Sequence, residues 1–197
     1  KYKSLEELPL HAKVGTSSLR RQAQLLHWRG DLSIGTLRGN VQTRLRHLDE
    51  GKFDAIILAA AGLKRLGLAD RITSYISTDD SIPAAGPGVM AVEARSDDQE
   101  TLSLLSFLHD EDVASCIRSE RSFLAKVGGD CKVPAGIYAV PKGEGGIHVE
   151  AFIASPDGKK LYRGETDGTV DHAEEAGASI AEKLLDEGGR EILEKLS

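Results

Sequence analysis

Apolar residues in the first third of the chain alternate between short continuous runs and a helical repeat. The runs predict three strands, at Lys13–Gly15, Leu32–Thr36 and Ala55–Ala59. Each is followed by apolar positions three or four residues apart, which predict helices at about Leu19–Trp28, Val41–Glu50 and Ala61–Leu66. The third run is apolar throughout, as in a parallel strand covered on both faces. This order predicts an α/β unit built on a parallel sheet.

The pattern changes at the Pro- and Gly-rich segment Ile82–Gly88, which we interpret as a boundary. Val89–Ala94 is predicted to be one more strand. Beyond it the sequence predicts a helix at Asp112–Val127, a loop at Gly128–Pro134, strands at Gly136–Val140, Ile147–Ala154 and Lys160–Gly164, and a final helix at Ala173–Asp186. Ser155–Gly158 is a strong turn signal between two of these strands. The second part is therefore expected to be a small α+β module.

Charge is distributed unevenly along the 197 residues. The whole chain holds 25 Lys and Arg against 31 Asp and Glu, whereas residues 1–80 alone carry a net charge of +4. A surface that attracts anionic ligands is therefore expected in the first part. No apolar run approaches the roughly 20 residues of a membrane span. The first residues form no signal-peptide core, so we expect a cytoplasmic protein. The chain lacks an initiator Met, which is compatible with a piece of something longer.

Cysteine and histidine usage gives weaker signals. Two cysteines form no disulfide framework, and six histidines lack Cys or His partners at zinc spacing, so we expect no metal site. Cys131 lies in a Gly-rich loop beside Lys132, which favours a thiolate, although Asp130 opposes it. A functional thiol and a merely tolerated cysteine both remain open on this loop alone. Cys116 falls within a helical pattern and is expected in the core.

Five arginines follow the three predicted strands of the first part: Arg20, Arg21, Arg38, Arg44 and Arg65. A guanidinium matches a carboxylate or phosphate with two parallel hydrogen bonds. Ser17, Ser18 and Asn40 are good N-cap residues for the following helices, whose free N–H groups would face the same anion. Surface ion pairs are the alternative interpretation for any single arginine. Equivalent positions in consecutive units favour a pocket for a ligand with several negative groups.

Four motifs in this order resemble the porphobilinogen deaminase (hydroxymethylbilane synthase) family. They are Val14-Gly-Thr-Ser-Ser-Leu-Arg-Arg-Gln22, Leu37-Arg-Gly-Asn40 with Arg44, Ala55-Ile-Ile-Leu-Ala-Ala-Ala-Gly-Leu-Lys-Arg-Leu-Gly67, and Gly129-Asp-Cys-Lys-Val-Pro134. The resemblance implies a transferase of tetrapyrrole and heme biosynthesis. Such enzymes join four porphobilinogen molecules head to tail with release of ammonia, on a dipyrromethane cofactor held through a thioether.

The resemblance also implies roles for individual residues. Cys131 matches the cofactor attachment position. Cofactor and substrate carboxylates would be bound by residues matching the family motifs, namely Thr16, Ser17, Ser18, Arg20, Arg21, Arg38, Asn40, Arg44 and Arg65. In the family, an aspartate that stabilises the cationic reaction centre lies upstream of the point at which this chain begins. We therefore expect no catalytic residue in this chain, and an incomplete, inactive fragment.

The implied architecture is a periplasmic-binding-protein-like α/β domain followed by a small α+β domain with a three-stranded sheet and helices. Residues 1–87 would form the second domain of the family, residues 88–108 a returning segment of the largely missing first domain, and residues 109–197 the C-terminal domain. Full-length members are expected to be monomers. Pro87 and Asp130 depart from the usual family residues, Gln and Gly, at the hinge and beside the attachment cysteine.

Two other functions compete with this interpretation. A non-catalytic α/β module that binds small polycarboxylates would have the same first unit. Ser18–Arg29 and Asn40–His47 could instead form a basic nucleic-acid surface. The acidic balance of the chain and its aromatic content of 5% argue against nucleic acid, and no membrane partner is expected.

Overall fold

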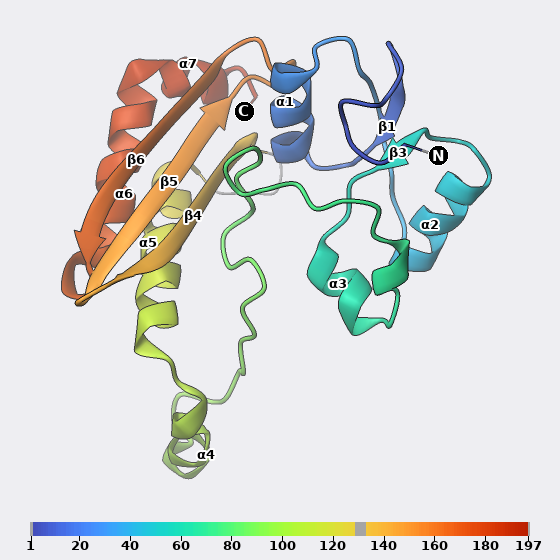
Figure 1. The fold of residues 1–197 in the computed structure, drawn as a ribbon. Helices are drawn as coiled ribbons and strands as arrows, with labels where there is room; N and C mark the ends of the chain where they lie inside the picture. The colour runs from blue at the N-terminus through green and yellow to red at the C-terminus, as the bar shows by residue number, and fades with distance from the viewer. Residues whose placement is uncertain (1, 129–132, 197) are drawn as a thin grey trace.

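The computed structural model describes residues 2–128 and 133–196. Its first unit contains a parallel sheet in the order β2-β1-β3. The strands are β1 (Lys13–Gly15), β2 (Ser33–Gly35) and β3 (Ala55–Ile56). They are followed in turn by helices α1 (Leu19–Trp28), α2 (Val41–Asp49) and α3 (Ala60–Arg65), as Figure 1 shows in blue to cyan-green. The predicted βα repeat is confirmed.

A small apolar cluster holds this unit together. Val14 at the centre of β1 is fully buried and packs in a group with Leu5, Leu8, Ala12, Leu25 and Leu32. Ser18 is the N-cap residue of helix α1, and its Oγ accepts a hydrogen bond from the Arg21 N–H at 3.4 Å. Asn40 is the N-cap residue of helix α2, and its Oδ1 accepts a hydrogen bond from the Thr43 N–H at 2.8 Å. These side chains satisfy backbone donors that would otherwise lack partners. A short 3-10 turn, Ala69–Arg71, follows α3.

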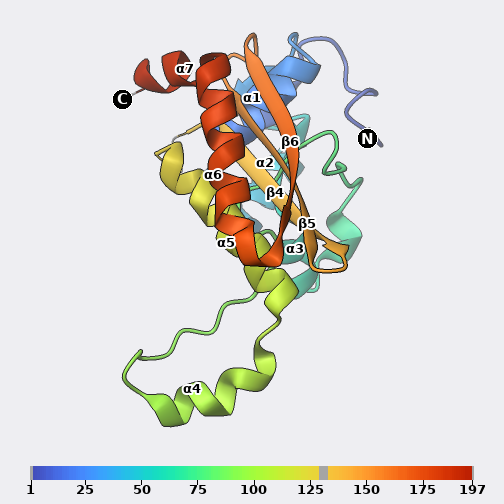
Figure 2. The same ribbon diagram turned by 90° about the vertical axis from the view of Figure 1, so that its left-hand side faces the viewer.

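The second unit is an antiparallel sheet in the order β4-β5-β6. The strands are β4 (Ala135–Gly143), β5 (Gly146–Ala154) and β6 (Leu161–Thr169). Helices α5 (Glu111–Lys126) and α6 (Ala173–Leu184) cover one face of this sheet (Figures 1 and 2). Between them lies the largest buried cluster, which includes Phe123, Ile137, Val149, Ile180 and Leu184. A 3-10 turn, Val170–His172, precedes α6, and a π turn, Leu185–Gly189, joins it to α7 (Arg190–Glu194).

The two units meet where α1 packs against the end of β5. Ala23 and Ile82 of the first part form a buried cluster with Phe152 and Ala154. Gly158, in the turn after β5, has φ +71°, and a Cβ there would collide with the His27 backbone nitrogen. Its carbonyl oxygen lies 2.9 Å from the His27 ring Nδ1. Glycine is therefore required at this contact.

A chain segment between the two units extends away from both sheets (Figure 2). It carries α4 (Gln99–Leu105) and the 3-10 turn Ser106–Leu108. Its apolar side chains are exposed, with Met90 at 76% and Phe107 at 80% of their maximal areas. The strand predicted at Val89–Ala94 is wrong, because these residues pair with no described strand.

Most other predicted elements are confirmed, with shifted ends. The predicted strands at Leu32–Thr36 and Ala55–Ala59 are shorter in the structure, and the one at Lys160–Gly164 is part of a longer strand. Helices α4 and α7 were not predicted. Cys116 is buried in α5, as expected. Among residues 2–128 and 133–196, we find no helix with the length and apolarity that a membrane crossing requires.

Candidate functional site

The candidate site lies at the carboxyl ends of the parallel strands, where three loops converge. Thr16 follows β1, is 4% exposed, and donates its backbone N–H to the Gly35 carbonyl at the end of β2 (3.0 Å). The Ser17 hydroxyl donates to the Leu37 carbonyl oxygen at 2.7 Å. Ser17 therefore links the β1 and β2 loops, and Ser18 alone caps α1. Carboxyl ends of strands in open α/β sheets are common ligand sites.

Arg21 reaches across the sheet toward the third loop. Its Nη1 donates to the Ile57 carbonyl oxygen, just past β3, at 3.1 Å. Burial, and secondarily the charge of Arg44, lower the pKa of Arg21. Arg44 in turn donates its Nε to the Gly39 carbonyl at 2.8 Å. Two guanidiniums of like charge are thus held near each other by backbone carbonyls, which favours a shared anionic partner.

Arg20 points to the junction with the second unit. Its Nη1 donates to the Ile82 carbonyl at 2.6 Å, and Gln24 Nε2 donates to the same oxygen at 3.1 Å. The Gln24 Oε1 accepts from the Ile82 N–H at 2.7 Å. Burial, followed by the charge of Arg21, lowers the pKa of Arg20 to about 10. An anionic ligand would stabilise this partly buried cation, because its present partner is a neutral carbonyl group.

The remaining two predicted arginines are on the rim. Arg38 follows β2 and Arg65 ends α3, and both side chains are exposed. Within residues 2–128 and 133–196, neither side chain makes a hydrogen bond or an ion pair. The structure thus brings Arg20, Arg21 and Arg44 within electrostatic reach of one another, and leaves Arg38 and Arg65 free to move toward a ligand.

Ion pairing separates these five arginines from the rest. The chain has 13 arginines. Seven of the other eight form ion pairs with carboxylates, and only Arg121 joins the five without one in the described part of the chain. None of the five forms an ion pair with a described residue. Because seven of the other eight arginines have a carboxylate partner, the five guanidiniums of the first unit that have none among the described residues indicate a site for an anionic ligand.

Neither cysteine can be placed in this site. Cys131, predicted to be the attachment residue, lies outside the described residues, as do Asp130 and Lys132. Cys116 is buried in α5, and burial, then the charge of Glu120, raises the pKa of its thiol. A buried thiol with a raised pKa is a poor nucleophile, so Cys116 does not substitute for Cys131.

Two family models match this chain. Residues 1–103 match the porphobilinogen deaminase domain described as the dipyromethane cofactor binding domain. Residues 114–186 match the porphobilinogen deaminase C-terminal domain. The chain belongs to the porphobilinogen deaminase family. Members of this family are hydroxymethylbilane synthases, enzymes of tetrapyrrole biosynthesis. Their substrate is porphobilinogen, and their cofactor is dipyrromethane.

The observed residues fit such a cofactor. A dipyrromethane made from two porphobilinogen units carries two acetates and two propionates, and the site offers five guanidiniums without carboxylate partners. Gln24 was not predicted to contribute, yet it fixes the Ile82 carbonyl that Arg20 binds. A sequence signal existed, because Gln24 follows Arg20 by one helical turn and so shares its face of α1.

Proposed function

We propose that this chain supplies the carboxylate-binding and cofactor-carrying part of a porphobilinogen deaminase. Arg20, Arg21 and Arg44 would hold carboxylates at the strand ends, and Arg38 and Arg65 would add contacts from the rim. Thr16, Ser17, Ser18 and Asn40 would shape the loops and orient N–H groups toward the same anions. The observation that carries this proposal is the set of five arginines without a carboxylate partner among residues 2–128 and 133–196.

Cys131 is proposed to hold the dipyrromethane through a thioether. When bound, this cofactor would supply the nucleophilic pyrrole carbon at which the oligopyrrole chain starts. The arginines would orient the ring carboxylates. Because every added pyrrole brings two more negative charges, several cationic positions along one cleft suit a lengthening ligand better than a single strong site would.

We further propose that the 197-residue polypeptide does not complete turnover by itself. Condensation with loss of ammonia creates positive charge on the substrate, which a carboxylate must stabilise. Among the described residues, no carboxylate lies within 4.0 Å of the five guanidiniums. The buried Glu120 instead accepts hydrogen bonds from the Gly86 and Ala139 N–H groups. We also propose that residues 1–87, 88–108 and 109–197 correspond to the three family segments named above.

Binding of porphobilinogen to matched arginine variants tests the ligand assignment. Isothermal titration calorimetry should show that Arg21→Gln weakens binding by about tenfold or more, as expected for one charge-assisted pair of hydrogen bonds. Arg46→Gln is the control, because exposed Arg46 lies on α2 but pairs with Glu50 at 3.7 Å. Equal loss in both variants would contradict a specific site. Equal affinity for tricarballylate and porphobilinogen would instead support the simpler polycarboxylate-binding module.

Two further measurements test the cofactor and the activity. Intact mass should show a dipyrromethane adduct on the chain and none on Cys131→Ser. A steady-state assay should detect no hydroxymethylbilane from the isolated chain. Continuous production would refute the inactive fragment, and an adduct that persists in Cys131→Ser would refute the attachment residue.

A further inference from the structure

The face of the second sheet that points away from α5 and α6 carries a group of ligating side chains, beside the part that packs against α1. In the antiparallel register of β5 and β6, His148 lies opposite Asp167 and Glu150 lies opposite Glu165. Alternate residues of a strand point to the same side, so all four side chains share this face. Search of the sequence for zinc spacing misses such a set, because its members come from two strands.

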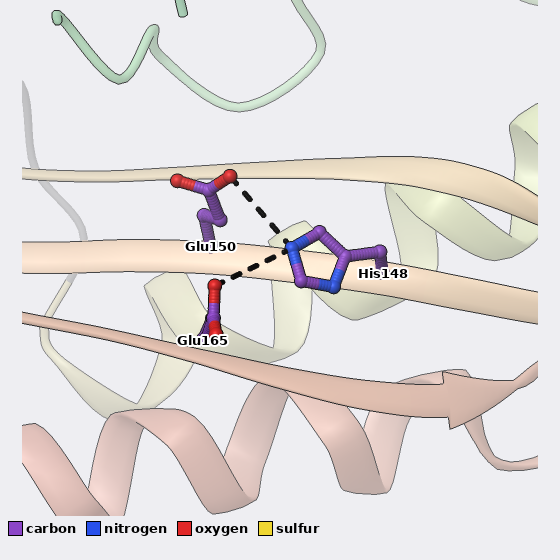
Figure 3. Close-up of side chains that lie close together, drawn as sticks. All are labelled: His148, Glu150 and Glu165. Carbon is purple, nitrogen blue, oxygen red and sulfur yellow. Dashed lines mark ion pairs between the residues drawn. The ribbon is translucent and has the colours of Figure 1, made fainter. Parts of the chain in front are cut away.

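The imidazole of His148 is held in a defined orientation. Its Nδ1 lies 2.8 Å from Asp167 Oδ1. The other ring nitrogen, Nε2, faces two carboxylates, with Glu150 Oε1 at 3.7 Å and Glu165 Oε2 at 3.8 Å (Figure 3). Nδ1–H donation to Asp167 would leave a lone pair on Nε2 between the two glutamates. This is the arrangement in which histidine binds metals.

We propose that His148 Nε2, Glu150 Oε1 and Glu165 Oε2 bind a divalent transition-metal ion, with Zn²⁺ as the test ion. The three ligand atoms already lie within 4.8 Å of one another. Tetrahedral zinc with bonds of about 2.0–2.2 Å needs its ligands roughly 3.3 Å apart. The two histidine–glutamate separations exceed this value by about half an ångström, so the three side chains must move together on binding. Water would complete the coordination.

Neighbouring charges orient the two less exposed ligands. Asp167 holds the ring of His148, and Arg163 Nη2 binds Glu150 Oε2 at 2.5 Å, which leaves Glu150 Oε1 toward the ring. Lys142 pairs with Asp167 from β4. With a neutral imidazole, three carboxylates face two cations on this surface, and the remaining negative charge favours a cation. His148 and Glu150 have side chains that are only 28% and 24% exposed, whereas Glu165 is 75% exposed.

Calorimetric titration of the chain with ZnCl₂ at neutral pH tests the proposal. His148→Gln should weaken binding by at least about a hundredfold. Asp167→Asn, which removes only the carboxylate behind the ligand, should weaken it by about 10–100-fold. His172→Gln is the matched control, since His172 is an exposed histidine beside a single carboxylate, Glu175. Equal losses from His172→Gln and His148→Gln, or unchanged binding in His148→Gln, would overturn the proposal.

A second measurement on the unaltered chain covers the case in which a variant fails to fold. Zn²⁺ should protect His148 from diethyl pyrocarbonate by at least about fivefold, and should leave His172 unprotected, as mapped by peptide mass spectrometry. Absence of protection at His148 would overturn the site. The result is independent of the proposed porphobilinogen site, because the readout involves no pyrrole ligand.

Discussion

The two units of the chain differ in the length of their strands and in the size of their apolar cores. The strands of the first sheet are two or three residues long, and its apolar cluster has six buried members. The strands of the second sheet are nine residues long and pack against helices over sixteen buried residues. Most stability from apolar burial therefore belongs to the second unit, since this term scales with the area removed from water.

Charge pairing follows the same division. The first unit keeps five arginines that have no carboxylate partner in the described parts of the chain, and two of them are partly buried. In the second unit, Arg118, Arg163 and Arg190 pair with carboxylates, and Arg121 alone has no such partner among the described residues. Unpaired like charges destabilise a folded chain in the absence of ligand. The comparison teaches that the proposed ligand site lies in the unit with the smaller core, where ligand binding would contribute most to stability.

The largest difference between the two units should appear when one methyl group is added to a helix of each. A Cβ at Gly177 of α6 would overlap the Ser119 carbonyl oxygen of α5. Gly177→Ala should lower the free energy of unfolding by about 3 kcal/mol or more, because the helices must move apart. Gly62→Ala in α3 is the control, since nothing lies within 4 Å of its Cβ position. This change should be neutral or stabilising by up to about 1 kcal/mol.

Urea unfolding followed by two probes measures both changes. Trp28, the sole tryptophan, ends α1 and reports on the first unit by fluorescence, whereas far-ultraviolet circular dichroism reports on all helices and strands. Gly177→Ala should shift the dichroism transition to lower urea. Similar midpoints for the two variants would show that the tight α5–α6 contact does not limit stability.

Local sequence patterns predicted the helix ends well, but they predicted poorly which segments pair as strands. Helix α1 was predicted with its observed ends, because Ser18 caps it and its apolar spacing is regular. The apolar run Val89–Ala94 was predicted to be a strand, but a strand needs a neighbour to share its hydrogen bonds, and none is described here. Strand β6 continues past Gly164 through a polar, half-exposed stretch, which gives no apolar signal for its end.

In the candidate site, too, local features could be predicted from the sequence and contacts between distant segments could not. The positions of the five arginines relative to the strands were visible in the sequence, because carboxyl ends of parallel strands meet at one edge. The direction of Arg20 was not, since it depends on the Ile82 carbonyl, 62 residues away. The pairing of His148 with Asp167 likewise depends on strand register. Residue types and local caps can be predicted from the sequence, whereas contacts between distant segments require the fold.

Glu120 provides a test of how the two parts are joined. It lies buried on α5 and accepts from Gly86 N–H at 2.6 Å and Ala139 N–H at 2.9 Å. Burial raises the pKa of Glu120 despite these two bonds. The folded chain thus holds this proton more tightly than the unfolded chain, so the free energy of unfolding should fall as pH rises through the raised pKa.

Glu120→Gln should remove this pH dependence and lower stability. The glutamine oxygen can accept only one of the two N–H groups well, so the loss should be about 1–3 kcal/mol at neutral pH. Urea unfolding at several pH values between 4 and 8 measures both effects. Glu111→Gln, an exposed change on the same helix, is the control. Superimposable pH profiles for the original chain and Glu120→Gln would contradict a raised pKa.

The smallest expected effect concerns Ser18, where folding and binding should change in opposite directions. Ser18→Ala removes the cap of α1 and should cost about 1 kcal/mol of folding stability. It should weaken porphobilinogen binding less than Arg21→Gln does, because Ser18 would only orient the N–H groups. Ser18→Asp keeps a capping oxygen and adds negative charge beside Arg20 and Arg21, so it should stabilise the free chain by roughly 0.5–1 kcal/mol. The same charge should repel ligand carboxylates and weaken porphobilinogen binding by about tenfold in calorimetry. Undiminished binding to Ser18→Asp would mean that carboxylates do not approach the first turn of α1.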